Sequence, residues 1–520
     1  MQKSLASLAV VALLAACAST PSNFSYKVPD QPEGSSGYTE KPGWATTKFA
    51  VAAANPLATD AGYQILKAGG SAMDAAIAVQ MVLTLVEPQS SGIGGGAFLL
   101  HFNGKDVEAF DGRETAPMAA TEKLFLKADG KPMAFYEGVV GGRSVGTPGT
   151  VRMLEMAHKQ HGKLPWSTLF QPAIALAEGG FKVSARLNTL LKSEQHLKKD
   201  PVAAAYFYKA DGTPHDVGHV LKNPELAAVL RKIAAQGSKG LLEGDVAQAI
   251  VDKVQKHPDN PGQLSLADLA NYQPKKRAPI CHDYKANARD FRICGFPPPS
   301  SGAIAVGQIL GTLNHAYASA IPLENGLPGA AWLHLYTEAA RMAFADRGQY
   351  VADPDFVQPP QMVKGFLLNN ELTDFSFAPA DAEGKPIANR VQPGKRPRSS
   401  MAPTLVFDKA TGQLVMSGGS PGGALIIHYT AKTLYGVLNW GMTPQQAINL
   451  PNFGSNNGPS LLEEKRFPPA TVEALRARGA EVREQNMTSG LQAITRGQAH
   501  GMQLWFGGAD PRREGIVMGD

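Results

Sequence analysis

The chain has 520 residues, which is enough for one large domain or for a few domains of ordinary size. Hydrophobic residues make up 43% and charged residues 18%, a composition typical of folded globular proteins. The net charge is only +5, and no basic run is interleaved with aromatic residues, so charge favours neither nucleic-acid nor membrane-surface binding.

The first residues predict export. Lys3 precedes an apolar stretch over residues 5–16, which is shorter than the ~20 residues of a membrane-spanning helix and typical of a secretory signal. The stretch ends in Leu-Ala-Ala before Cys17, which is similar to a bacterial lipoprotein signal and predicts lipidation of that cysteine. An ordinary secretory signal with a chance cysteine is the alternative. Because Ala18 rather than aspartate follows, the lipoprotein interpretation predicts an anchor on the periplasmic side of the outer membrane.

The domain prediction follows from this start. We assign residues 1–17 to the signal and residues 18–47, which are rich in polar and small residues, to a flexible tether. Beyond the tether, helical and strand patterns interleave without a regular repeat or an internal boundary. We therefore predict a single mixed helix-and-strand domain over residues 48–520.

Individual elements are predicted along that domain. Ser71 and Asp74 form a capping box that begins an alanine- and valine-rich helix. Thr443 and Pro444 mark another helix start, with proline at the first helical position. Further helices are predicted at 151–158, 225–235, 304–313, 331–344 and 431–438, and strands at 97–102, 107–110, 404–407 and 414–416.

Two cysteines remain in the exported chain. Cys281 and Cys294 flank what looks like two short strands around a polar turn. An oxidising periplasm favours one structural disulfide, and two buried free thiols are the alternative. No CxxC pair or HExxH motif occurs, so the sequence indicates no metal site. His158 and His161 lie in a predicted helix among lysines, and we expect them to be exposed to solvent.

Glycine-rich segments raise other possibilities. Residues 92–96 do not have the GxGxxG spacing of a dinucleotide site, and no P-loop sequence is present. Residues 418–422 match GxSxG after a predicted strand, so Ser420 could be the nucleophile of a serine hydrolase. This is the weakest of the functional hypotheses.

A series of short motifs runs along nearly the whole exported chain. They are ANPLAT at 54–59, the capping box with DAA at 74–76, SGIGGG at 91–96, DGRETAP at 111–117, GTPG at 146–149, PPSSG at 298–302, EAARMAFADR at 338–347, LLNNELTDFS at 367–376, KRPRSSM at 395–401 and GSPGG at 419–423. In this order they resemble the γ-glutamyltransferase, or glutathione hydrolase, family.

The resemblance implies an α+β fold, a four-layer αββα sandwich of the N-terminal-nucleophile hydrolase type. It implies self-cleavage into a large part, here residues 48–360, and a small part, residues 361–520. The implied reaction cleaves or transfers the γ-glutamyl group of a glutathione-like amide, without a cofactor. The expected partner is therefore a small molecule, with no nucleic acid and no membrane contact beyond the lipid anchor.

The resemblance also assigns ligand-binding roles. Arg113 would bind the α-carboxylate of the glutamyl group bidentately, a geometry suited to guanidinium. Asp374 would accept hydrogen bonds from the α-ammonium group. The other residues placed around the ligand are Asn370, Glu371, Ser399 and Ser400, and the family often has glutamine in place of Glu371. Gly422 and Gly423 would offer backbone N–H groups to the developing oxyanion, which places Ser420 in the oxyanion loop.

The expected nucleophile is absent. In the family a threonine attacks the γ-carbonyl, and its own α-amine, freed by self-cleavage, acts as the base. That threonine lies between the elements that correspond to residues 353–356 and 367–370, where this chain has only residues 357–366, without Thr, Ser or Cys. Several tens of residues, including central strands, are thus predicted to be missing between Pro360 and Gln361. Thr337 and Thr373 are not credible replacements, because one lies in a predicted helix and the other in the ligand motif.

The sequence therefore predicts a family member that is inactive as written. The alternative is a natural, non-catalytic lipoprotein that binds γ-glutamyl compounds at the cell surface.

Overall fold

The computed structural model describes residues 37–356 and 371–520, and a seven-stranded antiparallel sheet lies at its centre. In spatial order its strands are β1 (Trp44–Thr46), β16 (Met502–Ala509), β15 (Gln492–Ala499), β11 (Leu414–Gly419), β10 (Thr404–Asp408), β9 (Arg289–Gly295) and β8 (Ile280–Ala286). The strands predicted at 404–407 and 414–416 are confirmed as β10 and β11.

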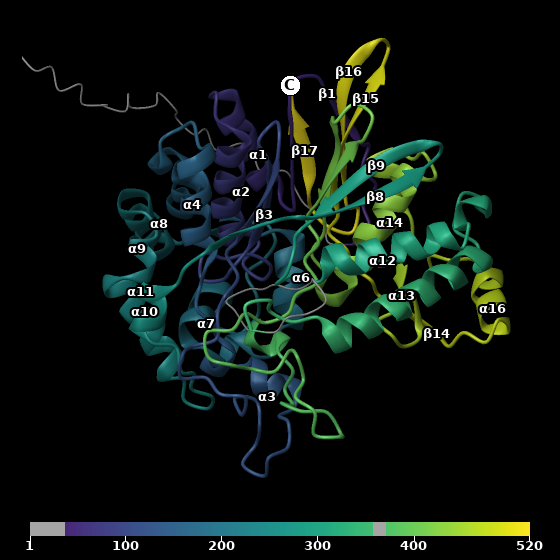
Figure 1. The fold of residues 1–520 in the computed structure, drawn as a ribbon. Coiled ribbons are helices and arrows are strands. Elements are labelled where there is room, and N and C mark those ends of the chain that lie inside the picture. The colour runs from purple at the N-terminus through teal and green to yellow at the C-terminus, as the bar shows by residue number, and fades with distance from the viewer. Residues whose placement is uncertain (1–36, 357–370) are drawn as a thin grey trace, which may run out of the picture.

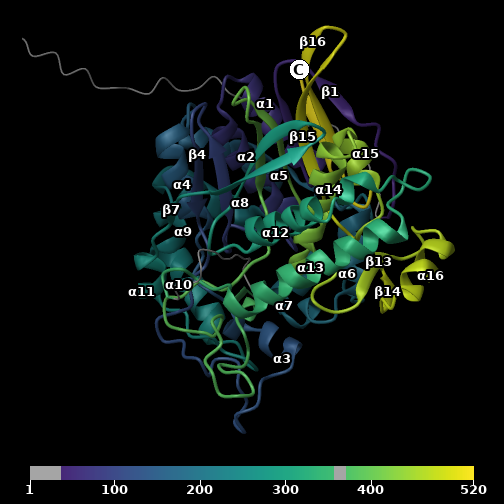
Figure 2. The same cartoon turned by 45° about the vertical axis from the view of Figure 1, so that its right-hand side comes forward.

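Helices cover one face of this sheet. α12 (Gly302–His315), α14 (Ile426–Leu438) and α15 (Pro444–Asn449) contact its strands, and α13 (Ala330–Tyr350) packs on α12 (Figures 1 and 2). Trp332 and Tyr336 of α13 and Tyr435 of α14 are buried in the hydrophobic core that these helices share. A small sheet of β12 (Phe453–Gly454), β13 (Ser460–Glu463) and β14 (Val482–Gln485) lies beside α16 (Pro469–Ala477).

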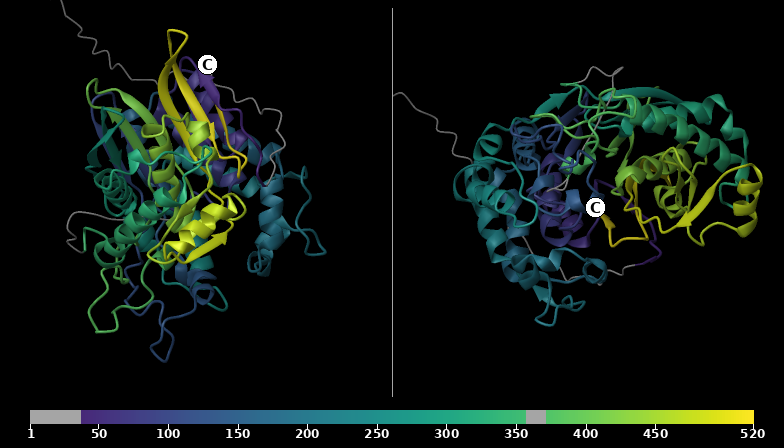
Figure 3. Two further views of the ribbon diagram at one scale, coloured as in Figure 1. Left: turned by 90° about the vertical axis from the view of Figure 1, so that its right-hand side faces the viewer. Right: turned by 90° about the horizontal axis from the view of Figure 1, so that it is seen from below.

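The opposite face carries a second strand layer. β2 (Ala50–Ala53) pairs with β17 (Ile516–Gly519), and this pair contacts β15 and β16. α1 (Pro56–Lys67) packs outside the pair and against α2 (Ala72–Val86), which completes the order helix, sheet, sheet, helix. Figure 3 shows the amino-terminal helices and the α12–α14 region on opposite sides of the strands.

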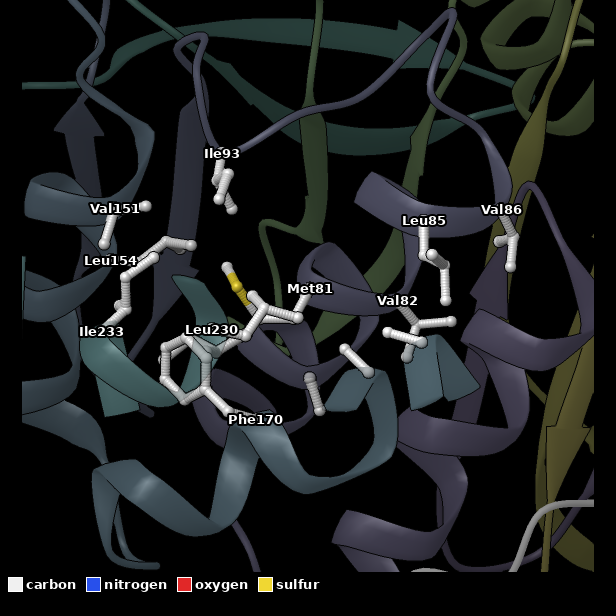
Figure 4. Close-up of a cluster of buried hydrophobic side chains, with 14 of the residues drawn as sticks. Met81, Val82, Leu85, Val86, Ile93, Val151, Leu154, Phe170, Leu230 and Ile233 are labelled. Atoms are coloured by element: carbon white, nitrogen blue, oxygen red, sulfur yellow. The ribbon is translucent and has the colours of Figure 1, made fainter. Parts of the chain in front are cut away.

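The outer amino-terminal region is mostly helical. It contains α3 (Phe135–Val139), α4 (Thr150–His161), α5 (Gln171–Gly179), α6 (Ala185–Ser193), α7 (Pro201–Phe207), α8 (Pro224–Gln236), α9 (Lys239–Leu242), α10 (Gly244–Gln255) and α11 (Leu266–Asn271), with the strand pair β5 (Phe181–Lys182) and β6 (Val220–Leu221). Met81, Phe170 and Leu230 are fully buried where α2 meets these helices (Figure 4). Burial of each such side chain contributes about 1.5–3 kcal/mol to stability.

A separate three-stranded sheet lies next to the helical region. It consists of β3 (Phe98–Phe102), β4 (Val107–Asp111) and β7 (Lys275–Arg277). Within residues 37–356 and 371–520 this sheet and the β2–β17 pair remain two separate sheets. The predicted four-layer α+β arrangement is confirmed. The loss of central strands stays a prediction, since the junction between Pro360 and Gln361 lies outside the described residues.

Local predictions agree with the structure. The Ser71 hydroxyl accepts from the Asp74 backbone N–H at 3.2 Å, and the Asp74 carboxylate accepts from the Ser71 N–H at 2.8 Å, so the capping box begins α2. Cys281 and Cys294 face each other across β8 and β9 and form the predicted disulfide. Asn287, with a φ of 48°, supplies the left-handed backbone that the tight turn of this hairpin requires.

Two predictions about exposure and order are wrong. The tether assigned to residues 18–47 ends too late, because Trp44 of β1 pairs with Gly507 and Tyr38 lies 4.2 Å from the Arg466 guanidinium. His158 and His161 are largely buried rather than solvated, at 15% and 17% side-chain exposure, because this face of α4 packs against the protein.

No helix in the described part of the chain is long and apolar enough to cross a membrane.

Candidate functional site

Arg113 lies two residues beyond β4, in a loop that the fold holds closely. The Asp111 carboxylate accepts from the Arg113 backbone N–H at 2.9 Å and from Arg277 Nε at 2.7 Å. A Cβ at Gly112 would lie 2.6 Å from the Cβ of Met153 on α4, so only glycine permits this approach. The loop therefore presents the Arg113 side chain in a single orientation.

The Arg113 guanidinium is completely buried and lies at the centre of the site. Its Nε donates to the Pro397 carbonyl at 2.9 Å, and one terminal nitrogen donates to Asp374 at 3.0 Å. The other terminal nitrogen lies 3.4 Å from Glu371. With the buried Glu114 at 3.7 Å, the fork of donors faces three carboxyl groups in the described structure, and a ligand carboxylate would have to compete with them.

Glu371 and Asp374 occupy one 3₁₀ turn, Glu371–Asp374. Burial, and then the nearby Asp374 carboxylate, raise the pKa of Glu371 well above its ordinary value, while Arg113 opposes the shift. The Asp374 side chain is 45% exposed and remains accessible to a cationic group such as an ammonium. The 3₁₀ turn therefore places the buried carboxyl group of Glu371 close to the carboxylate of Asp374, a hydrogen-bond acceptor that a ligand can reach.

Two further guanidinium groups complete the cluster, although sequence reasoning gave them no role. Arg398 Nη1 donates to the Arg347 carbonyl at 3.0 Å, and burial together with Arg398 lowers the pKa of Arg347 to about 9. Within residues 37–356 and 371–520, neither forms an ion pair with a carboxylate at 4.0 Å or less. The only indication of Arg347 and Arg398 in the sequence was that each lies within one of the family-like motifs.

The two predicted serines lie beside these arginines. Arg347 donates to the Ser400 hydroxyl at 2.8 Å, and the Ser399 hydroxyl accepts from the Met401 N–H at 2.8 Å. Both serines are buried, with 3% and 6% exposure. Because each hydroxyl accepts a bond from the protein, its own proton can be donated to a ligand oxygen.

Gly422 and Gly423 lie in the turn from β11 to α14, with φ values of 142° and 57°. Among the described residues no acceptor binds their backbone N–H groups, which lie just before a helix. Pairing of Thr404 with Gly418 brings this turn to the same edge of the sheet as the segment with Ser400. The oxyanion role of this glycine pair stays a prediction.

Other predicted residues do not join the site. Ser420 occupies a strand-to-helix turn, but its hydroxyl donates to the Pro421 carbonyl at 2.8 Å and accepts from the Gly490 N–H at 3.1 Å. No hydrogen bond links it to a histidine in the described structure, so nothing activates it as a nucleophile. Thr337 is buried within α13, where its hydroxyl donates to the Leu333 carbonyl. Asn370 lies outside the described residues.

Comparison with known proteins decides the family. The model of the gamma-glutamyltranspeptidase family matches residues 58–364 and 361–520. The chain belongs to this family. Two of its relatives are named glutathione hydrolase proenzyme, from Bacillus subtilis (strain 168) and Escherichia coli (strain K12). Each is 31% identical, over 559 and 539 residues, and the alignments cover 90% and 89% of this chain and 91% and 90% of the relatives.

Solved structures place this gamma-glutamyltranspeptidase-family chain in the N-terminal-nucleophile hydrolase fold. Cephalosporin acylase from Bacillus halodurans has a TM-score of 0.78 at 25% identity, covering 95% of this chain and 98% of that one. Helicobacter pylori gamma-glutamyltranspeptidase has a TM-score of 0.55 at 33% identity, covering 61% of this chain and 87% of that one. The fold and the enzyme family expected from the sequence are therefore confirmed.

Proposed function

We propose that this chain binds γ-glutamyl compounds through the Arg113 cluster and, as written, does not cleave them. The buried Arg113 guanidinium beside the accessible Asp374 carboxylate carries the proposal. An α-amino acid end needs donors for its carboxylate and an acceptor for its ammonium group, and these two residues offer both within 3.0 Å of each other. Glutathione and related γ-glutamyl amides carry such an end.

Binding rearranges the ion pairs of the cluster. The ligand carboxylate takes over the Arg113 donors, which Asp374 and Glu371 share in the free protein. Asp374 then receives hydrogen bonds from the ligand ammonium. Ser399 and Ser400 donate their hydroxyl protons to the carboxylate, and the charges of the neighbouring Arg347 and Arg398 guanidinium groups attract it.

The proposed lack of catalysis rests on the segment at 357–366, which has no Thr, Ser or Cys. Two findings support an internal deletion there. The family model matches in two stretches that meet at residues 361–364, and the alignment with the Bacillus subtilis relative runs over 559 residues, more than the 520 of this chain. The relative therefore carries residues that this chain lacks.

Catalysis is tested on the purified full chain with γ-glutamyl-p-nitroanilide, using the Escherichia coli relative as the positive control. We expect one uncleaved band in denaturing electrophoresis and no release of p-nitroaniline. Self-cleavage into two chains, or steady release of the chromophore, would show that a nucleophile is present after all. Insertion of the corresponding Bacillus subtilis segment between Pro360 and Gln361 should restore both activities.

Binding is tested separately by calorimetric titration with glutathione and with L-glutamate. We expect saturable binding that Asp374→Asn weakens at least tenfold, because the neutral amide oxygen still accepts hydrogen bonds but no longer carries the negative charge that attracts the ligand ammonium group. Arg231→Ala is the matched control, since it removes an exposed guanidinium paired with Glu178, outside the Arg113 cluster. Equal affinity in all three proteins, or no binding by the wild type, would overturn the proposed ligand site.

The choice between a defective gene and a natural binding protein depends on the codons for Pro360 and Gln361. Resequencing the gene and its transcript across this junction decides it. A continuous longer reading frame shows that the gene encodes the nucleophile segment and that the sequence as written omits it. An unchanged junction that is expressed and binds glutathione supports the non-catalytic binding protein.

We also propose that the chain is an outer-membrane lipoprotein, exported to the periplasm and anchored at Cys17, which lies outside the described residues. The apolar stretch before this cysteine supports the proposal. Cys17→Ser should move the protein from the membrane fraction to the soluble periplasmic fraction and abolish labelling with radioactive palmitate. Unchanged labelling in the variant would exclude this cysteine as the anchor.

A further inference from the structure

Three residues that the γ-glutamyl site does not use converge between the β3–β4 hairpin and α4. His101 on β3 and Glu108 on β4 are direct cross-strand partners. His161 belongs to the last turn of α4 and contacts His101, with ring centroids 4.1 Å apart and ring planes tilted by 30°. Residues distant in sequence thus bring two imidazoles and one carboxylate together.

The ligand atoms of this cluster point at one another. His101 Nδ1 lies 3.5 Å and His161 Nε2 lies 2.5 Å from the same Glu108 oxygen, Oε2. One atom from each of the three residues can be chosen so that all lie within 4.8 Å of one another. All three atoms are buried, and within the described structure their polar contacts are with one another, without the geometry of an ordinary hydrogen bond. Buried polar atoms without such a bond are rare and call for an explanation.

A divalent transition ion such as Zn²⁺ fits this donor set. Zinc binds imidazole nitrogen and carboxylate oxygen at about 2.0–2.2 Å, so tetrahedral ligands lie roughly 3.3 Å apart. The separation of 3.5 Å between His101 and Glu108 already fits. The contact of 2.5 Å between His161 and Glu108 must open by roughly 1 Å, which a small rotation of a side chain at a helix end allows.

The surroundings of Glu108 resemble the outer shell of a metal ligand. The Lys276 ammonium donates to the other carboxylate oxygen, Oε1, at 2.5 Å, and to Gln160 Oε1 at 2.8 Å. Such a bond fixes the carboxylate so that Oε2 remains directed at the imidazoles. The lysine charge also repels a cation, so we expect weaker affinity than at structural zinc sites built from cysteines.

We propose that His101, Glu108 and His161 bind a divalent transition cation of the zinc type. The neutral imidazoles and the carboxylate supply three ligands, and solvent supplies the fourth. Glu108 lies five residues before Arg113, at most roughly 16 Å away along an extended chain, and within the described residues no ion pair joins the three residues to Arg113 or Asp374. The bound ion would therefore link α4 to the β3–β4 hairpin rather than act on the γ-glutamyl ligand. This proposal is independent of the proposed function.

Zinc binding is measured by competition with a chromogenic chelator, on the full chain purified without a histidine tag. We expect one equivalent of Zn²⁺ to bind and to raise the temperature of thermal unfolding. Substitution with Co²⁺ should give the visible absorption of a four-coordinate site. His161→Asn and Glu108→Gln, tested separately, should each weaken zinc binding at least tenfold and abolish the thermal shift.

The matched control is His219→Asn, which disrupts a second histidine pair, His215 and His219, with ring centroids also 4.1 Å apart. It should change the zinc affinity less than twofold. Loss of binding in this control but not in His161→Asn would identify adventitious binding and overturn the proposal. Absence of zinc binding by the wild type, or equal affinity in every variant, would also overturn it.

Discussion

Removal of the Arg113 guanidinium is the sharpest test of the cluster around it. The side chain has no exposure to solvent, and Arg113→Ala leaves several groups without their partner. They are the carboxylates of Asp374 at 3.0 Å, Glu371 at 3.4 Å and Glu114 at 3.7 Å, and the carbonyls of Pro397 at 2.9 Å and Arg398 at 3.3 Å. Breaking a buried ion pair on one side costs about 3–5 kcal/mol, and we expect a loss of stability of this size.

The same reasoning predicts rescue by a second substitution. Glu371→Gln alone should change the free energy of unfolding by less than about 1 kcal/mol, because Glu371 already holds its proton more readily than a free glutamate. In the Arg113→Ala background it should restore about 1–2 kcal/mol, since glutamine avoids the cost of either burying the charge of this carboxyl group or protonating it. Urea unfolding of the wild type, both single variants and the double variant measures this coupling.

The loss should also depend on pH. Without Arg113 the pKa of the buried Glu371 carboxyl rises further, so the folded variant binds more protons than its unfolded chain. Its stability therefore falls as pH rises above the ordinary pKa of glutamate, 4.5, by up to about 1.4 kcal/mol per pH unit and proton. The difference in unfolding free energy between the variant and the wild type should become smaller as the pH is lowered from 8 to 5. A loss below about 1 kcal/mol, additive with Glu371→Gln and independent of pH, would refute the reasoning.

Further predictions concern the oxyanion turn and the disulfide. Gly423→Ala, with open space around the Cβ, should cost about 1–2 kcal/mol in urea unfolding from left-handed strain alone, whereas Gly422→Ala should cost at least about 1 kcal/mol more, because its Cβ would also lie 2.6 Å from an aromatic ring at a φ of 142°. Equal losses would contradict the close approach of the ring to Gly422. A fluorophosphonate probe should leave Ser420 unlabelled in mass spectrometry, since no histidine activates it, and a covalent adduct would restore the serine-hydrolase hypothesis. Replacing both Cys281 and Cys294 by serine should lower stability by roughly 3 kcal/mol, the loop-entropy estimate for a separation of 13 residues, and an unchanged unfolding midpoint would refute it.

The sequence predicted the elements that follow local rules. The capping box at Ser71 and the proline start at Pro444 were predictable, because the side chains that begin these helices are neighbours in sequence. The pairing of β8 with β9 was equally local, since the turn joins them directly. In contrast, β1 and β17 are short and pair with strands far away in sequence, so their strand state depends on tertiary contacts.

The candidate site was predicted in part for the same reason. Motif matches identified Arg113 and Asp374, but not that they would bind each other in the absence of ligand. The buried charges of Arg347 and Arg398 were missed because burial is a property of the folded chain. The cluster at His161 was missed because its ligands come from a hairpin and a helix without the spacing of a metal motif.

The pairing of β2 with β17 in the second strand layer brings segments from the two ends of the described domain together. The Asp520 carbonyl accepts from the backbone N–H groups of Thr47 and Lys48 at 2.6 and 2.7 Å, and the Thr39 N–H donates to the Pro511 carbonyl at 2.8 Å. Residues 47 and 48, near the start of the described domain, therefore lie beside residue 520 at its end. A linker long enough to run from residue 520 past β1 to residue 37 would permit a circular permutant with new ends in an exposed loop, such as the turn at Gly212, without loss of strand pairing. Any affinity tag placed after residue 520 would lie beside Thr47 and Lys48, where the chain enters β2.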